Sequence, residues 1–420
     1  MLVKNSAIIF TALFLSSAAS FVFQVMMGKT LPLGDFGQLS AILAIQGIFS
    51  VLPGGMILLY ARHAAALRAR NGDTALSALY GRSMKESVAA AVVSGVAVAA
   101  TAPWWSQWMH IESGAAAILT ALLIAVYFVQ APPLAFVRGL QHFWLFAVGL
   151  GGAGVLKVAL AAAVIAAGMN TVSNAVVALI VSALLSIAVL HLALVRGMAH
   201  GAPAPHGLSR KETAAFLFSA LAGSVFPMIY LNADMILIRS VMPAEVSGHY
   251  GAFMVAGKVI LQLGQVVGIA LFPAVVAGSA TGGGVSPAIA FRGFGLVLAA
   301  GLCAVALAFQ FPELYLRFIL KSSDSSLAPF LGWYALSAVA VALLFVESNY
   351  SLARHRFGYL IPGALAAAAQ VAGIIRFSGS LEAIVKFQAA LFWGVFLIRA
   401  AVLLRELKAA QPVTEGSRTR

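Results

Sequence analysis

Three lysines interrupt long apolar stretches of the sequence, and buried cations of this kind can bind a ligand or balance another charge: Lys157, Lys258 and Lys386. An ionisable side chain in the middle of a bilayer costs several kcal/mol, so it ordinarily faces a cavity or a partner. Lys258 lies deepest, and Gln262 and Gln265 follow it at i+4 and i+7, on the same face of a helix. We expect this face to line a cavity, and the alternative is a structural ion pair within a helix bundle.

The other two lysines are placed differently. Lys157 follows the run of small residues Gly149–Gly154, which allows helices to approach each other closely. Cavity lining and structural pairing both remain open for Lys157. Lys386 lies a few residues after an apolar stretch begins, so we expect its ammonium group to extend to the membrane interface.

Asp234 is an acidic residue within the expected span 213–238, and Asn232 lies two positions before it. Both follow Pro227, which removes one backbone hydrogen bond and can kink the helix. A carboxylate near a helix break can bind a proton or a cation, and it can equally act as counter-ion for a buried lysine or for Arg239. Glu347 is expected to pair with Arg354 or Arg356 near the end of its span.

Several prolines lie within or near the ends of the apolar stretches, where they could bend helices for gating. Prolines are also ordinary residues of transmembrane helices, so both interpretations remain open. Besides Pro227, the prolines at these places are Pro53, Pro132, Pro133, Pro273 and Pro362.

The composition places these residues in a membrane protein. The chain has 420 residues, of which 62% are hydrophobic and 9% charged, and its mean hydropathy is +0.98. No soluble globular class has this composition. The net charge of +13 is explained by basic cytoplasmic loops, so we expect no nucleic-acid partner.

The motifs of common enzymes are absent from the sequence. Cys303 is the single cysteine, which excludes internal disulfides and cysteine-based metal clusters. The eight histidines have no metal-ligand spacing, and there is no Walker A, HExxH or GxSxG motif. We therefore expect a transporter rather than an enzyme, with no catalytic residues, no metal and no cofactor, driven at most by a proton or sodium gradient.

We expect twelve membrane-spanning helices, because apolar stretches of about 20 residues recur along the chain. The first is interpreted as an uncleaved span rather than a signal peptide, because its apolar run continues to Met27. The expected spans are 5–27, 38–61, 86–104, 114–137, 143–167, 173–195, 213–238, 248–275, 289–310, 327–350, 358–375 and 382–404.

The basic residues predict the orientation and the domain boundaries. If the N-terminus is cytoplasmic, eighteen basic residues fall inside and five outside, which is a clear positive-inside bias. Both termini are then cytoplasmic. We expect a first six-helix lobe at 1–200, a cytoplasmic linker at 201–212, a second six-helix lobe at 213–405 and a cytoplasmic tail at 406–420.

Residues Thr30–Phe49 and Val241–Ile260 read as two copies of one segment, 211 positions apart. Without gaps the two copies share a proline, a glycine and an alanine: Pro32 and Pro243, Gly37 and Gly248, Ala41 and Ala252. Each copy is expected to form an outer turn, at 32–37 and at 243–248. Because each lobe has an even number of spans, the copies are parallel rather than inverted.

Four short stretches resemble bacterial polysaccharide exporters. These are the O-antigen and capsule-type lipid-linked oligosaccharide flippases of the multidrug/oligosaccharidyl-lipid/polysaccharide (MOP) exporter superfamily. The stretches are Leu33-Gly-Asp-Phe-Gly-Gln-Leu-Ser40, Asp234-Met-Ile-Leu-Ile-Arg-Ser240, Val246-Ser-Gly-His-Tyr250 with Phe272-Pro273, and Leu352-Ala-Arg-His-Arg-Phe357. The resemblance in organisation covers nearly the whole chain.

The resemblance implies an all-α polytopic fold with two parallel six-helix lobes around a central V-shaped cavity that opens alternately to either side. The implied substrate is an undecaprenyl-pyrophosphate-linked oligosaccharide, moved from the inner to the outer leaflet of the bacterial cytoplasmic membrane. A cationic cavity would attract the pyrophosphate, because Coulomb attraction is stronger there than in water. Lys258 and Lys157 could supply that charge, while Asp234 matches an acidic position that favours ion coupling.

Further partners implied by the resemblance are membrane lipids, a polysaccharide polymerase and chain-length proteins. One alternative is a cation-coupled multidrug or small-molecule antiporter of the same superfamily, although such a site would favour carboxylates over lysines. Another is a membrane glycosyltransferase or ligase, which would need a large external loop. A structural scaffold is a third, although buried lysines would then be costly without a purpose.

Overall fold

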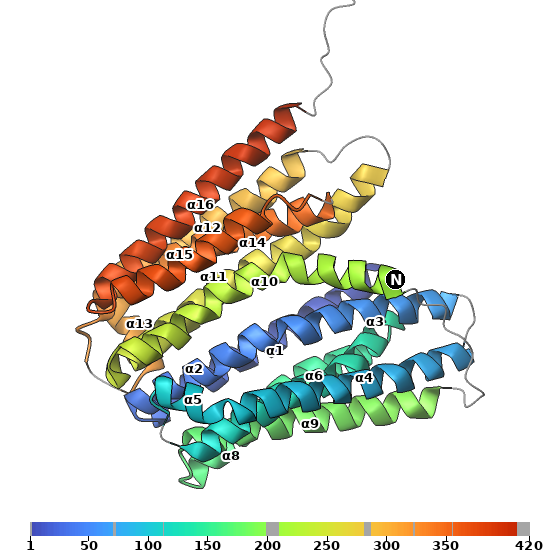
Figure 1. Cartoon of the computed structure of the whole chain (residues 1–420), viewed down its shortest axis with the longest axis horizontal. Helices are drawn as coiled ribbons and strands as arrows, with labels where there is room; N and C mark the ends of the chain where they lie inside the picture. The colour runs from blue at the N-terminus through green and yellow to red at the C-terminus, as the bar shows by residue number, and fades with distance from the viewer. Residues whose placement is uncertain are drawn as a thin grey trace, which may run out of the picture. The chain divides into compact units, whose positions relative to one another are not determined.

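The computed structural model describes residues 2–69, 73–111, 113–198, 210–280, 287–321, 324–354 and 356–409, and every regular element in these ranges is a helix (Figure 1). Within them, eleven helical stretches are long and apolar enough to cross a membrane. The additional apolar helix Leu360–Arg376 has 17 residues, the lower limit for a span. The predicted all-α polytopic membrane fold is confirmed.

The helices follow the expected spans closely, with two short helices between them. The elements up to residue 197 are α1 (Leu2–Thr30), α2 (Leu33–Phe49), α3 (Val51–Ala69), α4 (Asp73–Ala100), α5 (Ala102–Trp108), α6 (Gly114–Gly139), α7 (Phe143–Ala147), the π-helix η1 (Val148–Gly152), α8 (Ala153–Ala166) and α9 (Val172–Gly197). The later elements are α10 (Arg210–Val241), α11 (Ala244–Ala280), α12 (Pro287–Gln310), α13 (Pro312–Ile319), the 3₁₀-helix η2 (Ala328–Phe330), α14 (Leu331–Ala353), α15 (Leu360–Arg376) and α16 (Leu381–Ala409).

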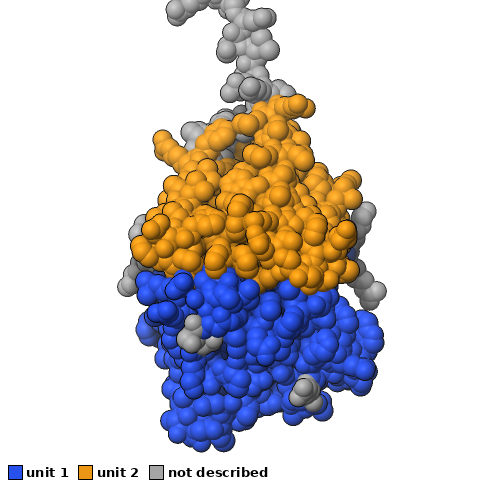
Figure 2. Space-filling view, turned by 90° about the vertical axis from the view of Figure 1, so that its left-hand side faces the viewer, with its two compact units in different colours: residues 1–255, 313–328 blue, residues 256–312, 329–420 orange. Residues whose placement is uncertain are grey.

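The chain divides into two compact units, coloured separately in Figure 2. Unit 1 comprises residues 1–255 and 313–328, and unit 2 comprises residues 256–312 and 329–420. The division therefore falls inside α11. The expected linker at 201–212 lies mostly outside the described residues, and the two six-helix lobes and the tail stay a prediction.

Unit 1 is organised around α6, which packs against α3, α4 and α9. Phe136 of α6 is fully buried, and Tyr80 of α4 meets its ring edge-on at 4.9 Å between centroids. Edge-to-face contacts of this kind add to the stability that burial supplies. In unit 2 the central element is α14, which is buried over most of its length and packs against α12 and α16.

The two outer turns are shorter than the sequence predicts. The second helices of the repeat begin at Leu33 and Ala244, directly after Pro32 and Pro243, because proline fits the start of a helix. Gly37 therefore lies in the first turns of α2 rather than in a turn between helices. Its role is close packing: a Cβ there would lie 2.3 Å from Ser247 Oγ.

Two short helices, α5 and α13, were not among the expected elements. Each follows the third span of its expected lobe, at Ala102–Trp108 and Pro312–Ile319. Helix α13 is amphipathic, with Leu316 and Ile319 buried and Leu314 exposed.

The expected long connection at 62–85 is also mostly helical, because α3 continues to residue 69 and α4 begins at residue 73.

Candidate functional site

Lys258 lies in α11, half-buried, about four turns from the start of the helix. A glycine stripe on the same helix packs against α14: a Cβ on Gly257 would lie 2.7 Å from the Tyr334 ring, and one on Gly264 would lie 2.8 Å from a carbonyl oxygen of α14. Lys258 follows Gly257 by one residue, so it points about 100° away from this packed stripe.

The two glutamines share the side of α11 that carries Lys258. Gln262 is exposed and Gln265 is half-buried. Their spacing of four and seven residues places all three polar groups on one face, roughly 80–160° around the helix from the glycine stripe. In unit 2, α11 thus presents one face to α14 and a separate polar face with a single cation.

Lys157 is held against the first helix. It lies in α8, and its ammonium group donates a hydrogen bond to Ser20 Oγ of α1 at 2.7 Å. The same ammonium lies 5.9 Å from the centre of the Phe23 ring, within the range of a cation–π contact. These contacts fix the orientation of Lys157 within unit 1.

The helix that carries Lys157 begins at the π-helix η1, in the small-residue run identified in the sequence. The wider helical turn leaves the carbonyl of Gly149 free to accept a hydrogen bond from Ser186 Oγ of α9, at 2.7 Å. A Cβ at Gly149 would lie 2.5 Å from Leu190, and one at Gly154 would lie 3.1 Å from the Cβ of Ala19. The small residues thus allow α8 to pack closely against both α1 and α9.

Asp234 is buried in unit 1, with an exposed fraction of 2%. Its Oδ2 accepts a hydrogen bond from the Tyr250 hydroxyl at 2.6 Å, and its Oδ1 accepts one from the backbone N–H of Met235 at 2.7 Å. Asn232 donates to the carbonyl oxygen of Met228 at 2.8 Å. The carboxylate is therefore held between α10 and α11 by a hydroxyl of one helix and a backbone N–H of the other.

The three prolines expected at helix breaks occupy different settings. Pro227 is buried inside α10, which continues through it. Pro53 lies just after the break between α2 and α3 at Ser50, because proline has no N–H to bond the carbonyl of Phe49. Pro273 lies within α11, and its side chain is outside the described part of the structure.

Arg239 is one of the five basic residues that the sequence predicts outside the membrane, in an outer loop. In the structure it is buried at the end of α10. Its guanidinium donates to the carbonyl oxygens of Met109 and His110 at 3.0 Å, to that of Gly34 at 3.3 Å and to Ser247 Oγ at 3.0 Å. Arg239 thus joins α10 to the ends of α5, α2 and α11.

Glu347 pairs with a residue that the sequence did not suggest. It bonds Arg399 of α16, and both side chains are buried, whereas Arg356 pairs with Glu406 at 2.6 Å. Ser351 also donates to Glu347, at 2.7 Å. The expected pairing of Glu347 with Arg354 or Arg356 is therefore wrong, because α16 brings a guanidinium closer than the following turn does.

Lys386 lies at an exposed position and pairs with Glu382 one turn earlier.

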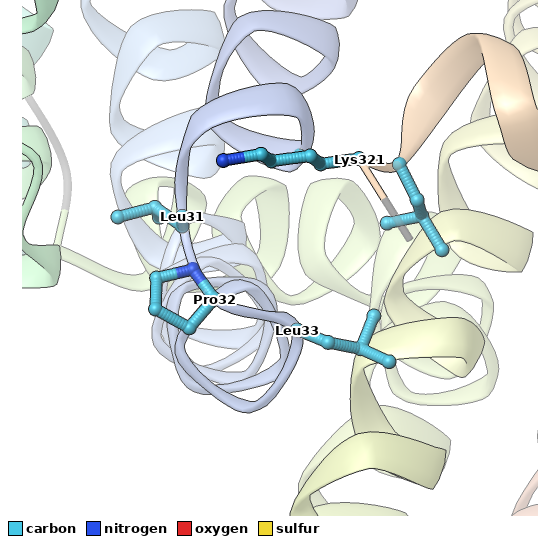
Figure 3. Close-up of a pocket in the computed structure, with 6 residues that line it drawn as sticks. Leu31, Pro32, Leu33 and Lys321 are labelled. Atoms are coloured by element: carbon cyan, nitrogen blue, oxygen red, sulfur yellow. The ribbon is translucent and has the colours of Figure 1, made fainter. Parts of the chain in front are cut away.

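In the part of the chain that the structure describes, no group of three or more histidine, cysteine or acidic residues could hold a metal ion. A cavity of about 210 Å³ lies beside the α1–α2 turn, where the Lys321 side chain extends above Leu31 and Pro32 (Figure 3). None of the expected site residues lines it.

Three groups in this description were not singled out from the sequence. Tyr250 contacts Asp234, and His249 contacts the backbone carbonyl of Asp324. Both residues lie in a stretch that carries the resemblance, but nothing in the sequence shows these contacts. Arg399 lies in the last span, and the sequence analysis included it only as one of the eighteen basic residues expected on the cytoplasmic side. A basic residue placed one turn inside the end of an apolar stretch is the signal that could have identified it.

Solved structures share the fold of this chain, although no family model matches it and no curated protein matches it in sequence. An inward-facing multidrug resistance MATE family transporter of the MOP superfamily matches with a TM-score of 0.73 at 12% identity, covering 96% of this chain and 100% of that one. The MATE multidrug transporter DinF-BH, solved as a complex, matches with a TM-score of 0.70 at 13% identity, covering 96% and 95%.

A lipid flippase has the same fold. The lipid II flippase MurJ, in an inward closed conformation, matches with a TM-score of 0.67 at 12% identity, covering 95% of this chain and 87% of that one. The chain is thus a multi-pass membrane protein with the fold of MOP superfamily transporters. At these identities the likeness establishes the fold, and the substrate has to be argued from the residues.

Proposed function

We propose that this protein is a flippase that moves a lipid-linked oligosaccharide across the bacterial cytoplasmic membrane by alternating access. The substrate is an undecaprenyl-pyrophosphate-linked glycan, carried from the inner to the outer leaflet for surface polysaccharide synthesis. The fold supports transport without catalysis, because it is shared with multidrug transporters and with a lipid flippase. Both termini lie on the cytoplasmic side in this proposal.

The observation that carries the proposal is the polar face of α11. Lys258 lies there with Gln262 and Gln265, turned about 100° from the glycine stripe that packs on α14. A lysine offers a mobile point charge to phosphate oxygens, and amide groups can bond sugar hydroxyls. The face thus suits an anionic head group that carries a glycan.

Lys157 and Asp234 have supporting roles in this proposal. Lys157 adds positive charge to unit 1 while bonded to Ser20. Asp234, held by Tyr250, binds the proton or sodium ion whose gradient drives the cycle. Polysaccharide polymerase and chain-length proteins would receive the exported glycan.

The second candidate is a cation-coupled multidrug antiporter. The MATE structures favour it through the fold, since two of them are described as multidrug transporters. An organic cation would be repelled by Lys258, so this function predicts a binding face built around the carboxylate of Asp234 instead. The two candidate functions differ in the charge of the residue that binds the substrate: the flippase requires the cation of Lys258, and the antiporter requires the carboxylate of Asp234.

The test replaces Lys258 in a bacterial strain whose own flippase gene is deleted. Lys258→Ala is expected to lower surface glycan by about tenfold or more, which corresponds to about 1.4 kcal/mol of lost substrate binding. Lys258→Arg keeps the charge and is expected to retain most export. Lys386→Ala is the matched control, because Lys386 is exposed and paired with Glu382.

Protein abundance in the membrane is measured for every variant by immunoblotting. Wild-type glycan levels in a Lys258→Ala strain with normal abundance would contradict recognition of the substrate by charge. Faster efflux of a cationic dye by the same variant, without any change in glycan, would favour the antiporter.

A further inference from the structure

A cluster of buried polar side chains lies in unit 2, where the last turns of α14 meet α16 and the start of α15. Glu347, Tyr350 and Arg354 are spaced i, i+3 and i+7, so they share one face of α14. Tyr359 directly precedes α15, and Arg399 lies on α16. Four of these five side chains are closed to water, with exposed fractions of 1% for Glu347 and Tyr350, 4% for Tyr359 and 8% for Arg399. These five residues are here called the Glu347 cluster.

The ion pair of Glu347 and Arg399 is the centre of the cluster. The Arg399 guanidinium and the Ser351 hydroxyl, the latter at 2.7 Å, both donate to the same carboxylate oxygen, Oε1. Tyr359 lies beside this pair, since a Cβ on the preceding Gly358 would lie 4.0 Å from Arg399 Nη1. Burial, and after it the carboxylate of Glu347, raise the pKa of Tyr359 to about 12, while the guanidinium of Arg399 acts against this rise. The Tyr359 hydroxyl therefore stays protonated at neutral pH and can donate a hydrogen bond.

Arg354 brings a second guanidinium to the same face of α14. It lies 5.6 Å from the centre of the Tyr350 ring. Tyr350 packs in turn against Leu403, which follows Arg399 by one turn on α16. Among the residues that the structure describes, no carboxylate forms an ion pair with Arg354. Its positive charge is therefore not balanced by the ion pair at the centre of the cluster.

Every member of the cluster has one buried side-chain atom without a hydrogen-bond partner in the described part of the chain. These atoms are Glu347 Oε2, Arg399 Nε, Arg354 Nη1 and the hydroxyl oxygens of Tyr350 and Tyr359. Folded proteins leave only a few such atoms per 100 residues, because each carries a free-energy cost. Five of them in one cluster would cost a large part of the net stability of a domain. A small guest that bonds to them would remove this cost.

The chemistry of these atoms indicates the charge of the guest. The nitrogen atoms of Arg354 and Arg399 can only donate, and the two tyrosine hydroxyls can also donate, so four of the five atoms suit an acceptor. The two guanidiniums and the single carboxylate of Glu347 leave an excess of one positive charge. The neighbouring Arg356 and Glu406 pair with each other at 2.6 Å and add no net charge. A metal cation would be repelled here, and water alone would leave the excess charge in place.

We propose that the Glu347 cluster binds one small monovalent anion, for which chloride is the abundant candidate. The anion accepts hydrogen bonds from the guanidiniums of Arg354 and Arg399 and from the two tyrosine hydroxyls. One water molecule donates to Glu347 Oε2 and, with its second hydrogen, to the anion. A single-atom anion suits the cluster because its atoms are buried, and a phosphate group would have to separate the helices.

The bound anion would join α14, the start of α15 and α16 within unit 2. It would enter from the side of the membrane that the basic residues predict to be cytoplasmic. This site is independent of the transported substrate, because neither Lys258 nor Asp234 belongs to it.

The test measures thermal unfolding of the full-length protein in detergent, in sodium chloride and in sodium gluconate of equal ionic strength. A ligand that binds only the folded protein raises the unfolding midpoint. We expect the midpoint to be about 2–4 °C higher in chloride, and the shift to saturate as the chloride concentration rises. Bromide is expected to substitute for chloride, and anomalous diffraction from crystals grown in bromide is expected to place it beside Arg399.

Three variants locate the site without removing the ion pair of Glu347 and Arg399. Tyr359→Phe deletes a single hydroxyl and is expected to lower the chloride shift by at least about half. In gluconate the same change should be neutral or stabilising, because it removes a buried hydroxyl that has no partner. Arg354→Gln removes the excess charge and is expected to abolish the chloride shift. Arg376→Gln is the matched control, because Arg376 is exposed at the far end of α15, and it should keep the full shift.

Equal unfolding midpoints in chloride and gluconate would overturn the proposal. A chloride shift that is unchanged in both Tyr359→Phe and Arg354→Gln would also overturn it, because chloride would then act at another place. Bromide density found only outside the cluster would have the same meaning. None of these measurements involves glycan export, so a chloride shift in a protein that exports no glycan would count against the proposed function alone.

Discussion

At the scale of single residues, three buried charged side chains have identified hydrogen-bond partners: Arg239, Asp234 and Glu347. Arg239 donates to three carbonyl oxygens and one hydroxyl, Asp234 accepts from Tyr250, and Glu347 bonds Arg399. Charged groups away from water are stable only when their hydrogen bonds are satisfied. Asp234 accepts a hydrogen bond from a tyrosine hydroxyl, whereas Glu347 is paired with a guanidinium.

This difference leads to a prediction for Asp234. Asp234→Asn keeps the size of the side chain and can still hydrogen-bond Tyr250, but it cannot take up a proton or balance a cation. We expect transport in proteoliposomes to lose its dependence on an imposed pH or sodium gradient, while thermal stability falls by less than about 2 kcal/mol. Glycan-lipid movement is measured with and without each gradient. Gradient-driven transport equal to that of wild type would remove the coupling role.

A second prediction concerns the buried pair of Glu347 and Arg399. Arg399→Met leaves the carboxylate of Glu347 buried without its cation and is expected to lower stability by about 3–5 kcal/mol. The double variant Glu347→Gln with Arg399→Met removes both charges and is expected to recover most of that loss. Thermal unfolding in detergent measures both.

The control for this pair is Lys386→Met, because Lys386 and Glu382 form a similar pair that is about half exposed. Exposed pairs contribute at most about 1 kcal/mol, so this variant should unfold close to wild type. If the double variant were as unstable as Arg399→Met, the loss would come from packing of the arginine stem rather than from the unbalanced charge.

The sequence singled out some of the charged residues inside the apolar stretches, but it missed the burial of Arg239 and Arg399 and it did not predict the partners. Lys157, Lys258 and Asp234 were visible because charges are rare in apolar stretches. The partner of Glu347 lies 52 positions away on another helix, and helix packing rather than local spacing decides this contact. For the same reason the contact of Tyr250 with Asp234 could not be predicted, although both residues belong to stretches that carry the resemblance.

At the scale of helices, the two copies of the repeat pack directly against each other. A Cβ on Gly37 would meet Ser247 and the N–H of Gly248, and one on Gly251 would lie 2.6 Å from Ser40 Oγ. Gly37 and Gly248 are equivalent at the offset of 211, and so are Ser40 and Gly251. The two segments thus cross at equivalent positions, and small residues allow their backbones to approach.

This crossing predicts that replacing Gly37 by alanine lowers the stability of the protein, whereas replacing Gly54 does not. Gly37→Ala would bring a Cβ to 2.3 Å from Ser247 Oγ and 2.8 Å from a backbone nitrogen, so we expect a loss of about 1–3 kcal/mol from overpacking. Gly54→Ala in α3 meets nothing within 4 Å, so it should be neutral or stabilise the helix by up to about 1 kcal/mol. Thermal unfolding of the two variants makes the comparison, and equal stability would contradict the close crossing.

Long apolar helices could be predicted from the sequence, whereas the elements between them could not. Nearly every expected span corresponds to a helix, because about 20 apolar residues leave no alternative in a bilayer. The break at Ser50 is the loss of one hydrogen bond, and the π-helix at 148–152 is a shift of one residue in hydrogen bonding; hydropathy registers neither. Helix α13 has an amphipathic pattern over only eight residues, too short to separate from a loop.

At the scale of the whole molecule, the two copies of the repeat and helix α13 meet within unit 1. Helices α2 and α11 come from opposite halves of the chain and cross near the expected external surface. Arg239 joins this crossing to α5, and Tyr315 of α13 joins it to α13 by its bond to the Ala252 carbonyl. Because α5 and α13 each follow a third span, the two halves of the chain contribute equivalent short helices beside this crossing.

In the alternating-access cycle that we propose, this crossing has to separate, which a disulfide can prevent. A Cβ on Gly34 would lie 3.1 Å from the Cβ of Ala244, a few tenths of an ångström short of the 3.5–4.5 Å typical of a disulfide. The variant Gly34→Cys with Ala244→Cys, in a Cys303→Ser background, is therefore expected to cross-link on oxidation. We expect the oxidised protein to lose glycan-lipid transport and the reduced protein to recover it.

The two single-cysteine variants distinguish locking from damage. Each alters the same crossing but cannot form the internal disulfide, so oxidation should leave their transport unchanged. Cross-linking is measured by the fraction of thiols that resist alkylation, and transport is measured on the same sample. A fully cross-linked protein that still transports would mean that α2 and α11 stay together throughout the cycle, so the substrate would have to leave by a path that does not open this crossing.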